Sequence, residues 1–241
     1  MAKKRKRKLK KKRVAVLIVV LLFAALCVIA MTAPLFNINY INITPCEHLT
    51  DEEILVSASI PKGENIFRTN LKKAKSKIAQ IPYVDKVEVT RKFPDKVIIK
   101  IVESIISGYV PSGDKFMGID KGGKVVEITN EPEEKIRLEG FKVIDAEPGK
   151  KIKFEKENDD ILFVILEKFD NYDITSLIST ANASNIINIT FTTKEGLKVI
   201  LGSEDEMDYK IKLFKNIREQ GYITGIFDVS NPSMPTYRSV E

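Results

Sequence analysis

Few side chains in this sequence of 241 residues could carry out nucleophilic or metal chemistry. It has one histidine, His48, and two cysteines, Cys27 and Cys46. Common zinc sites need several His or Cys ligands, and Ser–His or Cys–His nucleophiles need a histidine that a further polar group orients. His48 falls in a predicted loop, where a lone histidine is usually solvated, and Cys27 falls in an uncharged apolar run. The sequence therefore predicts no metal site and no nucleophilic catalytic residue.

Carboxylates are the remaining groups that could catalyse a reaction, and the chain has 33 Asp and Glu residues. A facing pair of carboxylates can act as general acid and base on a glycosidic bond. None of them lies in a recognisable active-site motif, and tryptophan, which is common in sugar-binding clefts, does not occur. Walker and GxGxxG sequences do not occur either. We therefore predict no catalytic residue, no cofactor and no small-molecule substrate. The alternative is a membrane-anchored cell-envelope enzyme acting on wall glycan, whose site would have to lie in residues 104–230.

The most distinctive stretch is the apolar run of residues 14–33, which contains no charge. Twenty residues in a helix rise about 30 Å, which matches the hydrocarbon core of a bilayer. A cleaved signal peptide is the alternative, but its apolar region is shorter, and Met31 and Pro34 fit poorly around a cleavage point after Ala33. The sequence predicts an uncleaved transmembrane helix.

Ten Lys and Arg residues lie between Lys3 and Arg13, immediately before the apolar run. Such clusters bind nucleic acid in other proteins, but next to a spanning helix they set topology and contact anionic headgroups. Without these ten charges the formal net charge of +6 becomes −4, so the rest of the chain has no nucleic-acid-binding character. We predict that the basic tail is cytoplasmic and that residues 34–241 lie outside the cytoplasm.

The residues after the anchor show the periodicity of a small α+β unit. Residues 36–43 alternate apolar and polar side chains as a half-buried strand does, with a slip of phase at Tyr40–Ile41. A capping box formed by Thr50 and Glu53 opens a short helix, and a second helix is predicted over residues 67–80. Alternation then predicts strands over 83–91 and 96–103, so the order is β-α-α-β-β.

This unit resembles the POTRA (polypeptide-transport-associated) domain of the bacterial cell-division protein family FtsQ, called DivIB in Gram-positive bacteria. The segments that carry the resemblance are Phe36-x-Ile38-x-x-Ile41-x-Ile43, Thr50-x-x-Glu53-Ile54, Gly63-x-Asn65-Ile66-Phe67, Ile81-Pro82-Tyr83-Val84-x-x-Val87-x-Val89-x-Arg91-x-Phe93-Pro94 and Val97-x-Ile99-x-Ile101-x-Glu103. The sequence departs from the family at Pro45-Cys46, where a Gly-containing turn is usual. A basic tail and a single anchor before the POTRA unit also match the family plan.

The residues beyond Glu103 predict a second domain. Strands are predicted over 105–110, 116–120 and 125–128, and short strands and loops over 129–153. Further predicted elements are a helix capped within Asn158–Asp160, a hairpin of 187–191 with 197–201, a helix with Met207, Ile211, Phe214 and Ile217 along one stripe, a last strand over 223–230 and a disordered tail from Asn231.

The predicted fold class is α+β. It comprises an N-terminal single transmembrane helix, a β-α-α-β-β POTRA domain and a second mixed α/β domain with an antiparallel sheet. The predicted divisions are a basic cytoplasmic tail 1–13, a transmembrane helix 14–33, a POTRA domain 34–103, a second (β) domain 104–230 and a disordered tail 231–241.

The resemblance implies a membrane-anchored divisome scaffold that binds the single-pass partners FtsL and FtsB (DivIC) and supports septum formation. It implies a single-pass protein of the cell membrane located at the division septum. In the family the partners dock near the last strand, which corresponds here to Gly225, Ile226, Phe227, Asp228, Val229 and Ser230. Because no later strand is predicted, this strand is expected at a sheet edge, where free N–H and C=O groups recruit a partner strand. The alternative is that Phe227 and Val229 are ordinary core residues.

Overall fold

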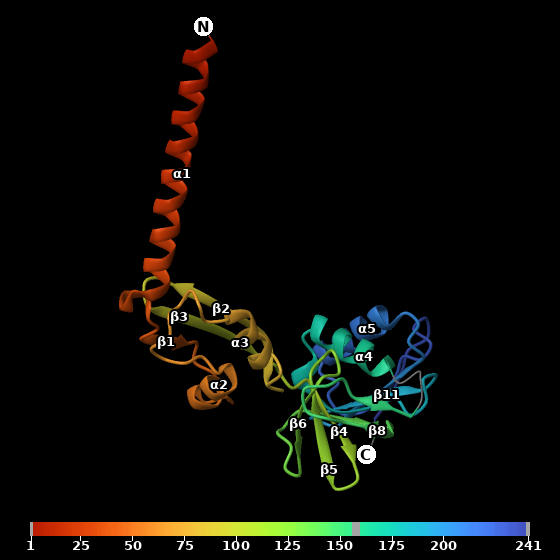
Figure 1. Cartoon of the computed structure of the whole chain (residues 1–241). Coiled ribbons are helices and arrows are strands. Elements are labelled where there is room, and N and C mark those ends of the chain that lie inside the picture. The colour runs from red at the N-terminus through yellow and green to blue at the C-terminus, as the bar shows by residue number, and fades with distance from the viewer. Residues whose placement is uncertain (1, 156–159, 240–241) are drawn as a thin grey trace. The chain divides into compact units, whose positions relative to one another are not determined.

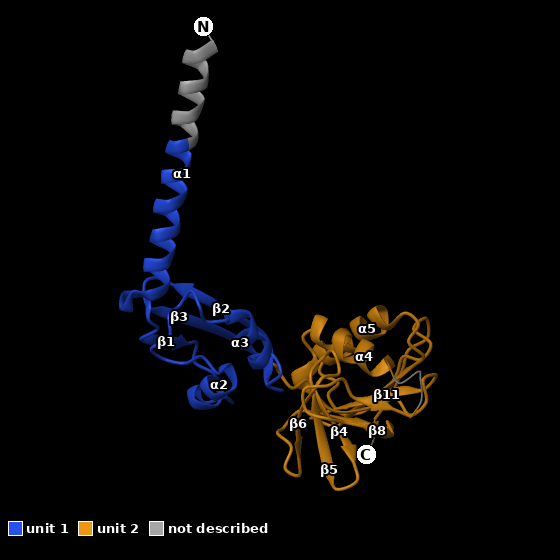
Figure 2. Cartoon of the chain, in the orientation of Figure 1, with its two compact units in different colours: residues 1–103 blue, residues 104–241 orange. Residues whose placement is uncertain are grey.

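The computed structural model describes residues 2–155 and 160–239, and Asn158 and Asp159 of the predicted helix cap lie outside the described residues. The chain forms two compact units, residues 1–103 and 104–241 (Figure 2). The fold class predicted from the sequence is confirmed, with an N-terminal apolar helix, a first unit of order β-α-α-β-β that we call the POTRA unit, and a second unit of mixed α/β structure.

Helix α1 (Ala2–Thr32) contains the predicted apolar span (Figure 1). Residues 14–32 have a mean hydropathy of 3.3, and none of this span is buried within the protein. Nineteen residues rise about 28 Å in a helix, which is close to the thickness of a bilayer core. A helix this apolar, with none of its span buried by the rest of the protein, has the properties of a single-pass anchor.

The POTRA unit packs two helices on one face of a three-stranded sheet (Figure 1). The sheet order is β1-β3-β2, with β1 parallel and β2 antiparallel to the central β3. The elements are η1 (Pro34–Phe36), β1 (Tyr40–Ile43), α2 (Asp51–Ala58), α3 (Leu71–Ile78), β2 (Val84–Lys92) and β3 (Lys96–Glu103). The side chains that are completely buried in its core are Ile38, Ile54, Ile66, Ile78, Val97 and Ile99.

Local capping sets the helix boundaries of this unit. The predicted capping box is present, because Thr50 Oγ1 accepts from the Glu53 amide at 3.3 Å and Glu53 Oε2 accepts from the Thr50 amide at 2.9 Å. Helix α3 begins at Leu71 and not at the predicted residue 67. The reason is that the Asn70 side chain accepts from the Lys73 amide at 3.1 Å and caps the helix there.

The second unit is built on a nine-stranded sheet of order β14-β13-β12-β11-β10-β7-β4-β5-β6, with β8 and β9 as a separate pair. Three of its pairings, β10 with β7, β12 with β13 and β4 with β7, are parallel, and the others are antiparallel. The elements are β4 (Gly108–Ser112), β5 (Lys115–Ile119), β6 (Val125–Thr129), β7 (Ile136–Glu139), β8 (Val143–Asp145), β9 (Lys153–Phe154), α4 (Ile161–Asn171), η3 (Thr175–Leu177), β10 (Ile178–Asn182), β11 (Ile189–Thr193), β12 (Leu197–Gly202), α5 (Met207–Glu219), β13 (Gly225–Asp228) and β14 (Thr236–Arg238).

Helices α4 and α5 pack their apolar stripes against the sheet through three phenylalanines. The ring centroids of Phe169 and Phe191 are 5.3 Å apart, and those of Phe191 and Phe214 are 4.9 Å apart, both in edge-to-face geometry. All three side chains are buried, as are Met207 and Ile211 of the predicted α5 stripe. Phe227 of β13 and the adjacent Val229 belong to the same buried core.

Candidate partner-binding site

The sequence placed partner binding on residues 225–230, at an edge of the sheet. Residues Gly225–Asp228 do form a strand, β13, but it lies between β12 and β14. Strand β14 pairs with it antiparallel, with Phe227 opposite Tyr237. The prediction that β13 is an edge strand is therefore wrong, and so is the prediction that the chain is disordered from Asn231 over the described residues up to 239.

Strand β14 escaped prediction because it has three residues and follows two prolines, Pro232 and Pro235. A turn brings the chain back, since the Met234 amide donates to the Asn231 carbonyl at 3.0 Å. Tyr237 then fixes the returning strand: its ring packs on Tyr222 with centroids 4.7 Å apart, and its hydroxyl donates to the Thr224 carbonyl at 3.0 Å. One tyrosine therefore ties the last strand to the residues just before β13.

The side chains of residues 225–230 contribute mainly to the hydrophobic core. Phe227 is 5% exposed and Val229 is completely buried, so the alternative that both are core residues is confirmed. Ile226 and Asp228 are half-buried, and Asp228 Oδ1 accepts from the amide and the hydroxyl of Ser230 at 2.9 and 2.7 Å. Little side-chain surface of this segment is left for a partner.

Backbone hydrogen bonds determine which edge is open. The Val229 amide donates to the Ile200 carbonyl of β12 at 2.9 Å. Amide directions alternate along a strand, so the amides of Ile226 and Asp228 face β14. Ile226 and Asp228 lie opposite Arg238 and Thr236, whose amides face β13 in turn. The N–H and C=O groups of Tyr237, between them, consequently point away from β13. Among the described strands, β14 is therefore the open edge at this end of the sheet.

A glycine permits the close approach of β14. Gly225 has φ of +97°, and a Cβ there would lie 2.6 Å from the Arg238 carbonyl oxygen. The opposite sheet edge, β6, is partly covered, because Val125 exchanges backbone hydrogen bonds with residues 149–150. Of the two edges of the nine-stranded sheet, β14 is therefore the better candidate for strand addition.

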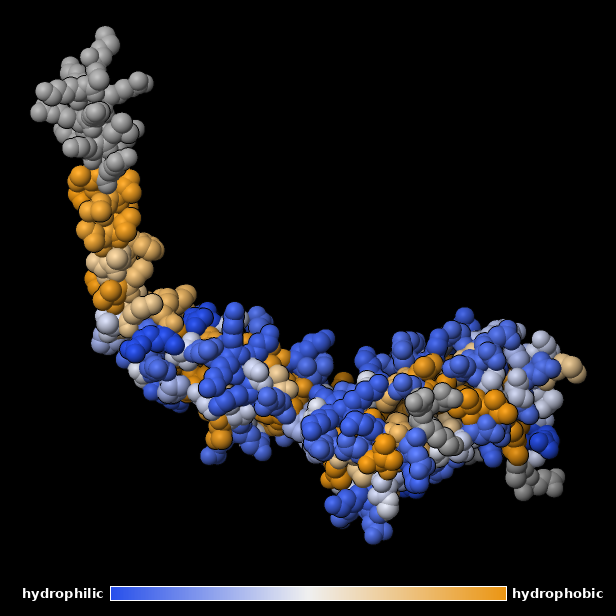
Figure 3. Space-filling view, turned by 45° about the vertical axis from the view of Figure 1, so that its right-hand side comes forward, coloured by the Kyte–Doolittle hydropathy of each residue, from blue (hydrophilic) through white to orange (hydrophobic). Residues whose placement is uncertain are grey.

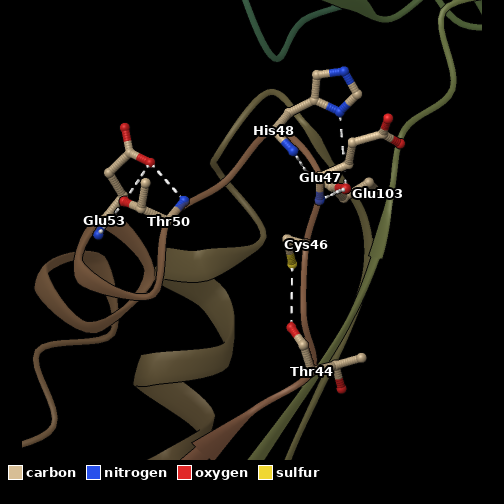
Figure 4. Close-up of polar contacts among 7 residues, drawn as sticks. All are labelled: Thr44, Cys46, Glu47, His48, Thr50, Glu53 and Glu103. Atoms are coloured by element: carbon tan, nitrogen blue, oxygen red, sulfur yellow. Dashed lines mark hydrogen bonds and ion pairs between the residues drawn. The ribbon is translucent and has the colours of Figure 1, made fainter.

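His48 and Cys46 lie elsewhere, in the POTRA unit (Figure 4). His48 stacks on Tyr83 with ring centroids 4.9 Å apart, and its Nδ1 is 3.8 Å from Glu103 Oε2. The Cys46 thiol donates to the Thr44 carbonyl at 3.4 Å. Burial, and then the negative charges of Glu103 and Asp51, raise the pKa of the Cys46 thiol, so the thiolate is disfavoured at neutral pH. This arrangement does not activate a nucleophile.

Glu103 has a structural function in the same cluster, because it connects the end of β3 to the loop before α2. Its carboxylate accepts from the amides of Glu47 and His48 at 2.7 and 3.0 Å. Burial alone would raise the pKa of the Glu103 carboxyl, but these amides and the His48 imidazole outweigh it, so the pKa lies below the ordinary 4.5.

This lowered pKa predicts a pH-dependent stabilisation of the POTRA unit. We expect Glu103→Gln to lower its free energy of unfolding at pH 7 by about 1–3 kcal/mol, because two hydrogen bonds to a charged acceptor are weakened. A carboxyl with a lowered folded-state pKa stabilises fully above the unfolded-state pKa and loses this contribution as pH falls through the folded-state value. The difference between the two proteins should therefore shrink as pH falls below the unfolded-state pKa of about 4.3 and disappear below the lower folded-state pKa, as measured by hydrogen exchange of residues 36–103. Glu88→Gln, at an exposed position of β2, should show no such difference.

A cleft of about 570 Å³ in the second unit is lined in part by carboxylates. They are Asp160 at the start of α4 and Glu204 and Asp205 after β12, and the other described lining residues are Ile161, Val164, Ile186, Ile187 and Ser203. Asp160 pairs with Lys151 at 3.5 Å, and Asp205 accepts from the Ser203 hydroxyl at 2.8 Å. In the described part of the chain, no group of three or more His, Cys, Asp or Glu side chains could hold a metal ion.

Comparisons with known proteins agree with this architecture. Residues 36–104 match the family model described as POTRA domain, FtsQ-type. The chain is 28% identical over 214 residues to the cell division protein DivIB of Clostridium tetani. The aligned region covers 85% of this chain and 78% of that protein. It is also 28% identical over 224 residues to DivIB of Clostridium acetobutylicum, with coverages of 88% and 86%. The cell division protein FtsQ of Corynebacterium glutamicum is 24% identical over 223 residues, with coverages of 90% and 93%.

These similarities extend from the POTRA unit through most of the second unit, and they support a role in bacterial cell division. Residues 36–104 therefore form a POTRA domain of the FtsQ type, and the chain is similar over most of its length to the bacterial cell-division proteins DivIB and FtsQ.

Proposed function

We propose that this protein is a membrane-anchored divisome scaffold which binds FtsL-like and FtsB/DivIC-like partners and supports septum formation. The observation that carries the proposal is the combination of one apolar span with two folded units behind it, in a chain similar to DivIB and FtsQ over most of its length. In this proposal α1 anchors the protein in the cell membrane at the division septum. The two units then lie outside the cytoplasm and present binding surfaces.

The FtsB/DivIC-like partner is proposed to add a strand to the outer edge of β14. Residues 225–230 would then contribute indirectly to partner binding, because β13 pairs with β14 and fixes its register. The support is the outward-facing backbone of Tyr237 and the buried core beneath this end of the sheet. Main-chain hydrogen bonds supply affinity in this mode of recognition, and alternate side chains supply selectivity.

Gly225→Ala tests this site. The new methyl group would meet the Arg238 carbonyl and force the strained φ of +97° on a residue with a Cβ, so β14 should detach. We expect capture of the FtsB/DivIC-like partner by the full chain in detergent extracts to fall about tenfold, which corresponds to roughly 1.4 kcal/mol. Asp228→Pro should have the same effect, because it removes an amide that faces β14.

Gly221→Ala is the matched control. Gly221 has a similar φ of +93°, but a Cβ there would have nothing within 4 Å. It imposes comparable backbone strain without touching β14, so partner capture should stay near the wild-type level. Full-strength binding by Gly225→Ala and Asp228→Pro, with β14 detached according to hydrogen exchange, would exclude β14 as the binding edge.

An envelope enzyme acting on wall glycan is the second candidate, because Asp160, Glu204 and Asp205 share one cleft. A glycosidase needs two facing carboxylates and a surface that binds the sugar rings, which aromatic side chains commonly provide. The described residues that line this cleft include no aromatic side chain. Release of new reducing ends from purified peptidoglycan that is lost in Glu204→Gln would establish the enzyme over the scaffold.

A further inference from the structure

Three phenylalanines in mutual contact, with Leu35 next to one of them in the sequence, form a largely exposed apolar surface at the end of the POTRA unit that follows α1. We call Leu35, Phe36, Phe67 and Phe93 the aromatic platform. Leu35 is 65% exposed, Phe93 56% and Phe67 39%, and Phe36 is half-buried. The rings of Phe36 and Phe67 lie 5.2 Å apart edge to face, and those of Phe67 and Phe93 lie 5.1 Å apart and stacked. A contiguous exposed apolar patch on a small domain marks an interaction surface.

A short connection along the chain and a hydrogen bond place this platform directly beside the end of the apolar span. Residues Pro34–Phe36 follow α1 after a single residue, Ala33. In addition, the Asn65 side chain donates to the carbonyl of Ala30, inside the span, at 3.0 Å, and accepts from the Phe67 amide at 3.0 Å. Asn65 thereby holds the loop that carries Phe67 against the last turn of α1. In Figure 3 the hydrophobic surface of α1 continues into hydrophobic surface where the helix meets the rest of this unit.

The depth of the platform follows from bilayer dimensions. Residues 14–32 fill a hydrocarbon core of about 30 Å, and a polar interfacial layer of roughly 5–7 Å lies on each side of it. Leu35 and Phe36 come three and four residues after Thr32, which puts them within that layer. Phe67 packs edge to face on Phe36 and Phe93 stacks on Phe67, so this chain of contacts keeps both rings close to Phe36 and to that layer.

Cationic side chains flank the platform in a way that suits lipid headgroups. Arg68 follows Phe67, Lys92 precedes Phe93, and both are exposed. Arg91 donates to the carbonyls of Ile66 and Thr69 at 2.8 Å and so fixes the Phe67 loop to β2. Aromatic and aliphatic side chains with neighbouring Lys and Arg are the composition of membrane-interface contacts. A bilayer surface matches both the apolar and the charged part of this surface.

We propose that the aromatic platform inserts into the headgroup region of the bilayer beside α1, so that the POTRA unit is docked on the lipid surface. The proposal rests on the membrane anchor of the proposed function. It goes beyond anchoring, because it assigns lipid contact to two loops of the folded unit, residues 64–68 and 92–95, that are distant from α1 in the sequence. Docking through three separate segments restricts rotation of the POTRA unit about the membrane normal, as a single linker could not.

The absence of tryptophan from the chain gives a direct test. The full chain is reconstituted into phosphatidylcholine–phosphatidylglycerol vesicles as the single-tryptophan variants Phe93→Trp and Phe67→Trp. We expect the emission of both to shift to the blue, to be quenched by lipids brominated near the headgroup end of the acyl chain, and to be protected from aqueous iodide. Two positions are used because one substitution could disturb the loop that carries it.

Two further variants separate this proposal from the anchor on which it rests. Phe23→Trp lies in the apolar span and is 67% exposed, so it should be quenched by lipids brominated deep in the chain. Val56→Trp lies on α2 and is 72% exposed, so iodide should quench it and brominated lipid should not. If Phe23→Trp shows lipid contact while Phe67→Trp and Phe93→Trp behave like Val56→Trp, the platform faces water or a protein and the proposal is wrong. Loss of lipid contact at Phe23→Trp would instead refute the membrane anchor.

Discussion

Replacing Ile99 by Asp is expected to abolish the folding of the POTRA unit while the second unit stays folded. Ile99 lies on the central strand β3, is completely buried, and has β1 on one side and β2 on the other. The substitution removes a large apolar contact and buries a carboxylate without a charged partner, at a cost on the order of 5 kcal/mol or more. A domain of about 70 residues has a free energy of unfolding of roughly 4–10 kcal/mol, so this loss removes most or all of it.

Hydrogen exchange of the full chain in detergent micelles measures this effect unit by unit. Amides of residues 36–103 should lose their protection in Ile99→Asp, and those of residues 104–239 should keep it. Val102→Asp is the matched control, because Val102 lies on the same strand, faces the other side of the sheet and is 55% exposed. Protection of the POTRA unit in Ile99→Asp equal to that in Val102→Asp would show that the assigned strand phase is wrong.

The POTRA unit was predictable because its determinants are local. Alternation fixed the buried face of β2 and β3, and the pair Thr50 and Glu53 fixed the start of α2 within one turn of the chain. The stripe of α5 was predictable for the same reason, since residues three and four apart in a helix share a face. In each of these cases the interacting side chains are close in the sequence.

The partner-binding end of the second unit was not predictable because its determinants are distant. The sheet order follows from pairings such as β4 with β7 and β7 with β10. The alternation of apolar and polar residues within a strand does not indicate which strands pair. Strand β14 depends on the packing of Tyr237 against Tyr222 and on the close approach that Gly225 permits. A tail with two prolines does not show the pattern of a strand. The sequence therefore predicts β13 as the edge strand, whereas the edge strand is β14.

The aromatic platform shows a further limit of sequence patterns. Helical spacing with Leu71 predicts Phe67 as a residue of a helix, and Phe93 falls between two predicted strands, so neither pattern marks these rings as exposed. The ring contacts that join them to Phe36 come from three separate segments. A large aromatic residue at a turn, which is usually polar, was the one available signal that Phe93 has an external partner.

A protease added to intact spheroplasts is expected to digest residues 34–241 completely and to leave a protected fragment of the basic tail and α1. Ten Lys and Arg residues precede the apolar span, and the first charge after it is Glu47. Such a difference in positive charge retains the basic end in the cytoplasm, where the inner leaflet also attracts it. Epitope tags at the N-terminus and at the C-terminus, followed by immunoblotting, identify which side is cut.

Neutralising the tail is the control for this prediction. Replacing all ten Lys and Arg residues by Gln leaves the span unchanged but removes the charge difference, so part of the population should insert with the opposite orientation and its C-terminal tag should become protected. If the unmodified chain instead lost its N-terminal tag and kept its C-terminal one, both folded units would lie in the cytoplasm. Neither β14 nor the aromatic platform could then meet partners or lipid on the outer face, and the proposed envelope scaffold would be excluded by topology alone.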